Sequence, residues 1–202
     1  MSGFSEEARG IYRLKVPFKV IYTSVFLIEQ EGRRLLVDCA TTAEDVDNCI
    51  LPALAKRGLA VTDLDALVLT HSHGDHAGGL ARLQELSPSL AVITDTRPLF
   101  GALSIYPLAG HTEDSIGVLD VRTGTLISGD GLQGAGVWKY RCYTKDRAAY
   151  FKTLQRIEND DRIKNILFSH AYEPWCKDSV AGRESVLACL QVCAEVAGGN
   201  EE

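Results

Sequence analysis

The feature that most constrains this chain is a six-residue cluster of potential metal ligands, His71-Ser72-His73-Gly74-Asp75-His76. Three of the five histidines in the chain lie within it. The cluster directly follows Leu64 to Thr70, a nearly continuous apolar run that predicts a buried strand. A loop that leaves a rigid strand holds its side chains in defined places, and imidazole and carboxylate are ligands that many divalent metals prefer. The cluster therefore predicts a metal site.

The spacing within the cluster favours two metal ions. His71 and His73 can face one ion from an extended loop, whereas Asp75 and His76 turn toward a different point, so one ion would leave ligands over. A histidine taken alone is most often a surface or hydrogen-bonded residue, and an aspartate such as Asp75 can cap a loop. Packing alone does not account for four such residues in six positions, which favours metal binding.

Three further candidate ligands also follow apolar segments. His111 comes just after residues 105–108, and His170 ends a strand predicted over residues 163–168. Asp130 lies between two glycines after a predicted hairpin, where it could also serve as a turn residue. Each candidate thus lies at a strand exit, and a sandwich could bring these exits together at one edge.

Strand-like and helix-like segments alternate twice, which predicts an α/β (α+β) sandwich with helices outside two inner sheets. No long linker interrupts them, so residues 1–202 are expected to form a single domain. Pro52 argues against one unbroken helix over residues 43–57, and only residues 1–7 and 198–202 look disordered. The expected strands are 11–16, 20–28, 33–38, 64–70, 91–94, 116–121, 125–128 and 163–168, and the expected helices are 43–57, 79–86, 145–158 and 180–196.

The net charge of −6 argues against a general nucleic-acid or anionic-membrane binder, which needs a basic face. Neither a secretory signal nor a membrane-spanning segment is visible. The six cysteines are interpreted as mostly buried small residues in a reducing compartment, with disulfides as the alternative, and Cys189 and Cys193 would share one helix face. We therefore expect a cytoplasmic protein with a small-molecule substrate and no nucleic-acid or membrane partner; the sequence does not indicate an oligomeric state.

Taken in order, these motifs resemble those of the metallo-β-lactamase superfamily. The residues from His71 to His76 look like the signature H-x-H-x-D-H of that family. Asp38, at the end of Leu36-Val37-Asp38, resembles an early strand-end aspartate that supports the metal loop in the family without usually binding metal. The later motifs of the family are similar to Gly110-His111-Thr112, Ser128-Gly129-Asp130 and Ser169-His170.

The resemblance implies a four-layer αββα sandwich and a dinuclear metal centre, usually of zinc, with iron or manganese in some branches. It implies a hydrolase in which a metal-bound hydroxide attacks a small ester, thioester or lactone. Asp75 and Asp130 would be ligands, and either could also take a proton as the tetrahedral intermediate collapses. The implied first site is His71, His73 and His111, and the second is Asp75, His76 and His170, with Asp130 bridging both.

Aspartate at position 130 makes the chain more similar to the glyoxalase II, lactonase and thiol dioxygenase groups than to true β-lactamases, which typically have cysteine there. The short segment after His170 argues against the helical domain with which glyoxalase II binds glutathione. The family often has proline after Gly-His-Thr, whereas Glu113 and Asp114 stand here and either repel anionic substrates or point to water. Candidate substrate-binding residues are Lys139, Tyr140, Tyr143 and Tyr172, although the basic segment 139–147 could equally be a solvated loop and helix start.

Three alternatives remain open. One is a mononuclear iron dioxygenase that acts on a persulfide or thiol, in which Asp75, His76 and His170 would not bind metal. The second is a nuclease of the RNA-processing type, which shares the metal motif but needs a nucleic-acid surface. The third is a metal-binding module that retains the site without turnover. The identity and stoichiometry of the bound metal separate the dioxygenase from the hydrolase.

Overall fold

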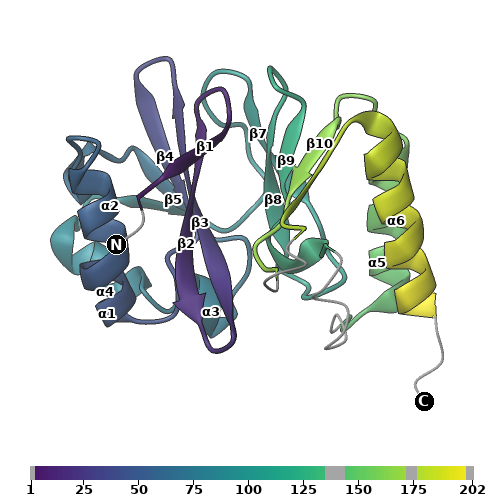
Figure 1. Ribbon diagram of the computed structural model, residues 1–202, viewed down its shortest axis with the longest axis horizontal. Helices are drawn as coiled ribbons and strands as arrows, with labels where there is room; N and C mark the ends of the chain where they lie inside the picture. Colours follow the sequence, from purple (N-terminus) through teal and green to yellow (C-terminus); the bar gives the residue numbers. More distant parts are fainter. Residues whose placement is uncertain (1–2, 135–143, 172–176, 199–202) are drawn as a thin grey trace. The chain divides into compact units, whose positions relative to one another are not determined.

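The computed structural model describes residues 3–134, 144–171 and 177–198, and it divides into two compact units, residues 1–94 and 95–202. Each unit is built on one β-sheet with helices beside it (Figure 1). The expectation that all 202 residues form a single domain stays a prediction.

The first unit contains a six-stranded sheet in the order β1-β2-β3-β4-β5-β6, in which β1 to β4 pair antiparallel and β4 to β6 pair parallel. Helices α1, α2 and α4 lie on one side of this sheet (Figure 1), and Leu27, Leu36 and Leu54 belong to the buried core of the unit. The strands are β1 (Ser5–Ala8), β2 (Ile11–Phe18), β3 (Ile21–Gln30), β4 (Arg33–Val37), β5 (Ala66–Val68) and β6 (Ala91–Ile93). The helices are α1 (Ala43–Asp45), α2 (Leu51–Ala55), α3 (Gly74–Ala77) and α4 (Leu80–Leu86).

The second unit contains a five-stranded sheet in the order β11-β10-β9-β8-β7, in which only β9 and β10 pair parallel. Helices α5 and α6 lie side by side (Figure 1) and contribute Tyr150, Ile157 and Val186 to the buried core of this unit. The strands are β7 (Leu103–Pro107), β8 (Ile116–Asp120), β9 (Thr125–Ile127), β10 (Asn165–Leu167) and β11 (Ser179–Ala181). The helices are α5 (Arg147–Glu158) and α6 (Arg183–Gly198).

The strand pairings explain why the candidate ligands gather within each unit. In the first unit β4 and β5 are parallel neighbours, so the residues that follow them, Asp38 and Thr70-His71, leave the same edge of the sheet. In the second unit β9 and β10 are parallel neighbours, so Asp130 and His170 likewise leave one edge. Each unit therefore presents a set of polar side chains at the carboxyl ends of two parallel strands.

The helical segment within residues 43–57 is not one regular α-helix, as Pro52 indicated. Thr42 caps α1, and a π-helical turn over Val46–Ile50 then leads into α2. A proline inside a regular α-helix lacks the N–H donor and collides with the carbonyl group four residues earlier. The wider turn, in which the N–H of Leu51 donates to the carbonyl of Val46, admits the proline without ending the helical segment.

Two expectations at the ends of the chain are wrong. Residues 5–7 were expected to be disordered, but they belong to β1, where Ser5 pairs with Arg13 and the carboxylate of Glu7 lies 3.2 Å from the buried Arg13 guanidinium. Residues 180 and 181 were expected to begin the last helix, but they belong to β11 (Ser179–Ala181). Gly182 (φ 86°) follows this strand, and α6 starts immediately after it.

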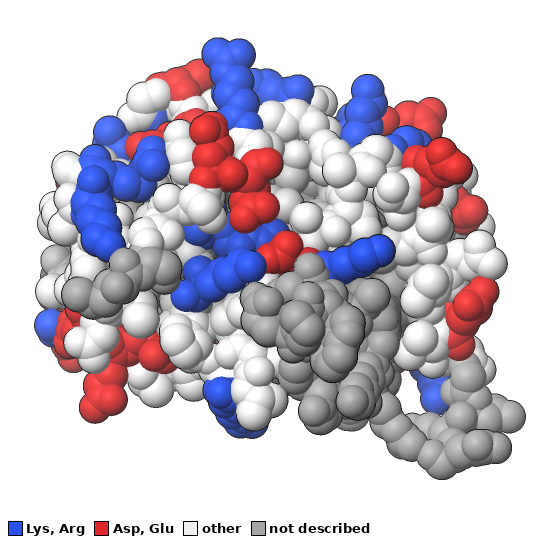
Figure 2. All heavy atoms as spheres, in the orientation of Figure 1, with Lys and Arg blue, Asp and Glu red and all other residues white. Residues whose placement is uncertain are grey.

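No described helix is long and apolar enough to cross a membrane. On the face shown in Figure 2, basic and acidic side chains of the described residues are interspersed. An extended surface of one sign is therefore absent from the described part of that face.

Replacement of a core residue in the first sheet should destabilise the fold. Leu27 is fully buried, so Leu27→Ala should lower the free energy of unfolding by about 2–5 kcal/mol because it leaves a cavity. Val20 is 76% exposed, and Val20→Ala should change that free energy by no more than about 0.5 kcal/mol. Urea unfolding of both variants tests the assignment of the core, and equal losses would contradict it.

Candidate functional site

The first unit brings His71, His73, Asp75 and His76 together after β5. His73 has an extended backbone (φ −64°, ψ 146°) and precedes α3, which contains Asp75 and His76. The ring centroid of His71 lies 4.6 Å from that of His73 and 4.2 Å from that of His76. Asp75 Oδ2 lies 3.7 Å from His76 Nε2. The chain thus changes direction after His73, as the spacing of the motif predicts.

Asp38 holds this cluster from the neighbouring strand. Its fully buried carboxylate accepts hydrogen bonds from the backbone N–H and the hydroxyl group of Thr70, each 2.8 Å long. The same carboxylate lies 2.7 Å from Nδ1 of His76, which therefore carries the proton and donates it. Because Nδ1 is the donor, the lone pair of His76 Nε2 is available to a metal ion.

The loop after β4 approaches the end of the histidine motif closely. The N–H of Cys39 donates to the carbonyl oxygen of His76 at 2.8 Å, and the N–H of Gly78 donates to that of Ala40 at 3.0 Å. A Cβ atom at Gly78 would lie 1.8 Å from the carbonyl oxygen of Thr41, so only glycine permits this approach. These backbone contacts fix the position of the motif.

Cys39 lies within this loop but is not arranged as a thiolate ligand. Its thiol donates to the carbonyl oxygen of His76 at 3.2 Å. Burial, with a further contribution from the charge of Asp38, raises the pKa of the Cys39 thiol to about 12. The side chain is therefore neutral at ordinary pH and acts as a hydrogen-bond donor in packing.

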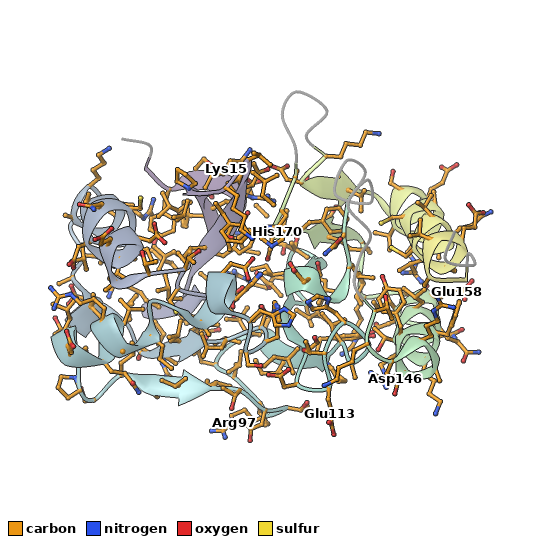
Figure 3. All side chains as sticks on the ribbon, turned by 90° about the horizontal axis from the view of Figure 1, so that it is seen from below. Lys15, Arg97, Glu113, Asp146, Glu158 and His170 are labelled. Atoms are coloured by element: carbon orange, nitrogen blue, oxygen red, sulfur yellow. The ribbon has the colours of Figure 1, made fainter. Side chains whose placement is uncertain are left out.

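The second unit brings His111, Asp130 and His170 together. Asp130 lies in a 3₁₀ turn, Gly129–Gly131, that follows β9, and His170, labelled in Figure 3, follows β10. His170 Nε2 is 3.2 Å from Asp130 Oδ1, and His111 Nε2 is 3.8 Å from Asp130 Oδ2. All three residues are buried. The two oxygens of one carboxylate thus face two different histidines.

The N-terminus of α5 holds the loop that carries His111. Gly110 has φ 146°, and a Cβ atom there would lie 2.7 Å from Tyr150 of α5. The backbone N–H of Asp146, the residue that caps α5, donates to the carbonyl oxygen of Gly110 at 3.0 Å. A side chain at position 110 would therefore displace both the helix and the adjacent His111.

The distance between the two ligand atoms of each pair is that expected when both bind the same ion. Two ligand atoms that each lie about 2.1 Å from a tetrahedral ion are roughly 3.4 Å apart. The distances of 3.2 and 3.8 Å about Asp130, and of 3.7 Å between Asp75 and His76, lie close to that value. The donors are imidazole nitrogens and carboxylate oxygens, which suit zinc, iron and manganese. Each of these pairs therefore fits a divalent metal ion.

The candidate substrate-binding residues lie outside the described residues: Lys139, Tyr140, Tyr143 and Tyr172. Glu113 and Asp114 are exposed, and Glu113 points outward in Figure 3. Sequence reasoning missed Thr70, whose hydroxyl lies 3.2 Å from Nδ1 of His71 and donates to Asp38. Its position directly before the motif was the available signal.

Part of this chain matches a known family model, and several known proteins are similar to it. Residues 19–96 match the family model described as the metallo-beta-lactamase superfamily. A hydroxyacylglutathione hydrolase of Xanthomonas axonopodis pv. citri is 32% identical over 163 residues, which cover 72% of this chain and 59% of that protein. The anti-Pycsar protein Apyc1 of Saccharibacillus brassicae is 44% identical over 62 residues, 31% of this chain and 23% of that protein. The chain thus spans less than two thirds of the length of these relatives.

Solved structures show the same fold over nearly the whole chain. The DIM-1 metallo-beta-lactamase has a TM-score of 0.74 at 15% identity and is covered to 96%, as is this chain. A metallo-beta-lactamase from Erythrobacter litoralis has a TM-score of 0.69 at 22% identity, with 94% of this chain and 96% of that chain covered. The expected fold class, an α/β fold of the metallo-β-lactamase type, is confirmed.

Loss of the Asp38 carboxylate should weaken metal binding. Asp38→Ala removes the acceptor that orients His76, and loss of such a supporting partner typically lowers metal affinity about 10- to 100-fold. Competition with a chromophoric zinc chelator measures this change on the folded protein.

Asp65 provides a matched control at the other end of the same strand pair. Its carboxylate accepts from the N–H of Arg34 at 2.7 Å and from the guanidinium of Arg33 at 3.1 Å. Asp65→Ala should lower stability without changing metal affinity. Equal metal affinity in the Asp38 variant and the original protein would show that Asp38 does not support the site.

Proposed function

We propose that this chain, which matches the metallo-beta-lactamase superfamily model over residues 19–96 and has a fold of that type, is a metal-dependent hydrolase with two metal ions that acts on a small ester, thioester or lactone. The observation that carries the proposal is the position of Asp130. Its two carboxylate oxygens face the Nε2 atoms of His111 and His170 separately. A carboxylate placed in this way is suited to bridge two ions, one through each oxygen.

The proposed centre combines the ligand sets of the two units. Support comes from the grouping within each unit, where ligand atoms of His71 and His73 lie within 4.8 Å of each other, and from the order of the motifs along the chain. Zinc is the expected ion, because histidine and aspartate are its usual ligands; iron or manganese would also accept this set. One ion would be held by His71, His73 and His111, the other by Asp75, His76 and His170, and both by Asp130.

In the proposed reaction, side chains of this chain orient the metal ligands and accept the proton. Bound divalent ions supply Lewis acidity, which lowers the pKa of water and polarises a carbonyl group. Asp38 keeps Nδ1 of His76 protonated and so orients the ring. The side chain of Asp75 is 17% exposed and that of Asp130 is 10% exposed, so Asp75 is the more accessible proton acceptor and Asp130 is chiefly a ligand.

The resemblance and the relatives support the proposed substrate class. The hydroxyacylglutathione hydrolase of Xanthomonas carries the name of a thioester-cleaving activity, which favours thioesters within the proposed class. The chain covers only 59% of that relative, so its specificity for the thiol part of the substrate need not be shared. The net charge of −6 and the interspersed charges in Figure 2 support a small-molecule substrate rather than a nucleic acid.

Metal analysis combined with a substrate panel tests the proposal. Protein isolated without added metal should contain two zinc ions per chain, and it should hydrolyse at least one member of a panel of thioesters, esters and lactones. One iron per chain with oxygen-dependent turnover of a persulfide would replace the hydrolase by the dioxygenase. Turnover of phosphodiesters alone would favour a nuclease, and two ions without any turnover would favour a metal-binding module.

Asp130→Ala should lower both metal content and rate. Loss of a ligand shared by two ions should reduce the bound metal and lower kcat/KM by more than about 100-fold. Elemental analysis and initial rates on the best panel substrate measure the two effects.

Asp160→Ala is the control in the same unit. Asp160 is a carboxylate paired with Arg162 at 2.7 Å, ahead of β10 rather than after it. Its replacement should leave metal content unchanged. An Asp130 variant that retains both ions and full activity would remove Asp130 from the site.

A further inference from the structure

Four of the six large apolar side chains that are exposed among the described residues lie on α5 and α6. They are 40–44% exposed: Phe151, Leu187, Val192 and Val196. Helix α6 already contributes Val186 and Leu190 to the buried core on its other side. Of its 16 residues, only Arg183, Glu184 and Glu195 are charged. A helix that is hydrophobic all round is normally covered on all sides, so we expect a partner on the outer side of α6.

The exposed apolar residues of α6 form a ridge beside a groove. Ala188, Val192 and Val196 recur every four residues, a spacing that lines up side chains along one side of a helix. A groove of about 830 Å³ lies between α5 and α6, and Phe151 and Leu187 are among the residues that line it. Helices pack by fitting such ridges into grooves. This surface, the α5/α6 face, therefore offers both halves of a self-complementary contact.

The two helices run antiparallel, which defines the ends of the groove. The guanidinium of Arg183, at the start of α6, donates to the carbonyl oxygen of Ile157, near the end of α5, at 3.1 Å. At the end of α6, a Cβ atom on Gly198 would lie 3.7 Å from the ring of Phe151, in the first half of α5. The groove therefore runs from the C-terminal end of α5 toward its N-terminal half.

Charged side chains of opposite sign line the two ends of this groove. Glu158 and Glu184 line the end where α5 stops and α6 starts. Lys152 lines it six residues earlier on α5, which is about 9 Å away along the helix axis. All three side chains are exposed, and none of them forms an ion pair with another described residue. The α5/α6 face thus has one basic end and one acidic end.

We propose that a second copy of the chain covers the α5/α6 face and that the protein is a homodimer. The second copy is turned end for end, so that Lys152 of each copy lies beside Glu158 and Glu184 of the other. A two-fold axis makes each contact twice, so both ends of the face are paired. The opposite arrangement would bring the two acidic ends together, and the repulsion between like charges disfavours it.

The apolar residues supply the affinity of this dimer, and the charges set its orientation. In the dimer Leu187 and Val192 leave water on both copies, and the gain in free energy grows with the apolar area that is buried. Charged groups at an interface act mainly on orientation and on the choice of partner. None of the proposed metal ligands lies on this face, so the dimer goes beyond the proposed hydrolysis and does not depend on it.

Sedimentation equilibrium of the metal-loaded protein tests the oligomeric state. At about 100 µM chain, well above a micromolar dissociation constant, the protein should have twice the chain mass of 22.0 kDa. The mass of a single chain at that concentration would overturn the proposal. The measurement needs no substrate, so its outcome is separate from that of the hydrolase assay.

Leu187→Glu tests the apolar part of the contact. The variant places a carboxylate in the apolar interface twice per dimer and should raise the dissociation constant by at least about 100-fold. Val121→Glu is the matched control, because Val121 is 42% exposed but directly follows β8 and lies outside the α5/α6 face. It should leave the dimer intact. Equal dissociation of the two variants, or an intact Leu187→Glu dimer, would overturn the proposal.

Charge reversal tests the orientation. Lys152→Glu makes the three charged positions all acidic, whereas Glu158→Lys combined with Glu184→Lys makes them all basic. Each of these proteins alone should dimerise at least about tenfold more weakly, because like charges then meet at both ends. An equimolar mixture should recover a dimer with one chain of each, since opposite charges then meet at both ends. Unchanged self-association of the separate proteins, or no recovery in the mixture, would overturn the end-for-end arrangement.

Discussion

The hydrogen bonds of one buried carboxylate, that of Asp38, determine the arrangement of the histidine motif. The carboxylate accepts two hydrogen bonds from Thr70 and one from His76, and all three are 2.7–2.8 Å long. A buried carboxylate is stable only when such partners satisfy it, so the strand end, the loop and the ring orientation are mutually dependent. Without these bonds the motif would remain in the sequence, but its side chains would not be held in one orientation.

Each unit uses the same device to gather its ligands. Two parallel strands end at one edge of the sheet. Nearby loops are then held by close backbone contacts that require glycine. In the first unit Gly78 permits the close approach of the loop after β4, and in the second Gly110 permits the approach of α5 to the His111 loop. The positions of the ligands therefore depend on backbone packing as much as on the ligands themselves.

Sequence reasoning identified the ligand motifs, because neither core packing nor turn formation requires so many metal-binding side chains within six positions. It also identified the strands that precede them, since β5 and β10 are short apolar runs. It missed β1, because this strand is charged and exposed and so has no apolar pattern. It missed β11 because the apolar residues around Val180 fit either a helix or a strand.

Contacts between distant segments could not be read from local patterns. The hydrogen bonds of Thr70, and the groove between α5 and α6, depend on which segments the fold brings together. The sequence did place Cys189 and Cys193 on one helix face, because that follows from helical spacing alone.

Anomalous X-ray diffraction at the zinc edge, from crystals of the zinc-loaded protein, tests the central claim most directly. The account predicts two peaks about 3.5–4 Å apart, both in contact with the Asp130 carboxylate. One peak should be bound by the histidines at 71, 73 and 111, and the other by Asp75, His76 and His170. A single peak, or two peaks that each contact residues of only one unit, would contradict the shared dinuclear centre.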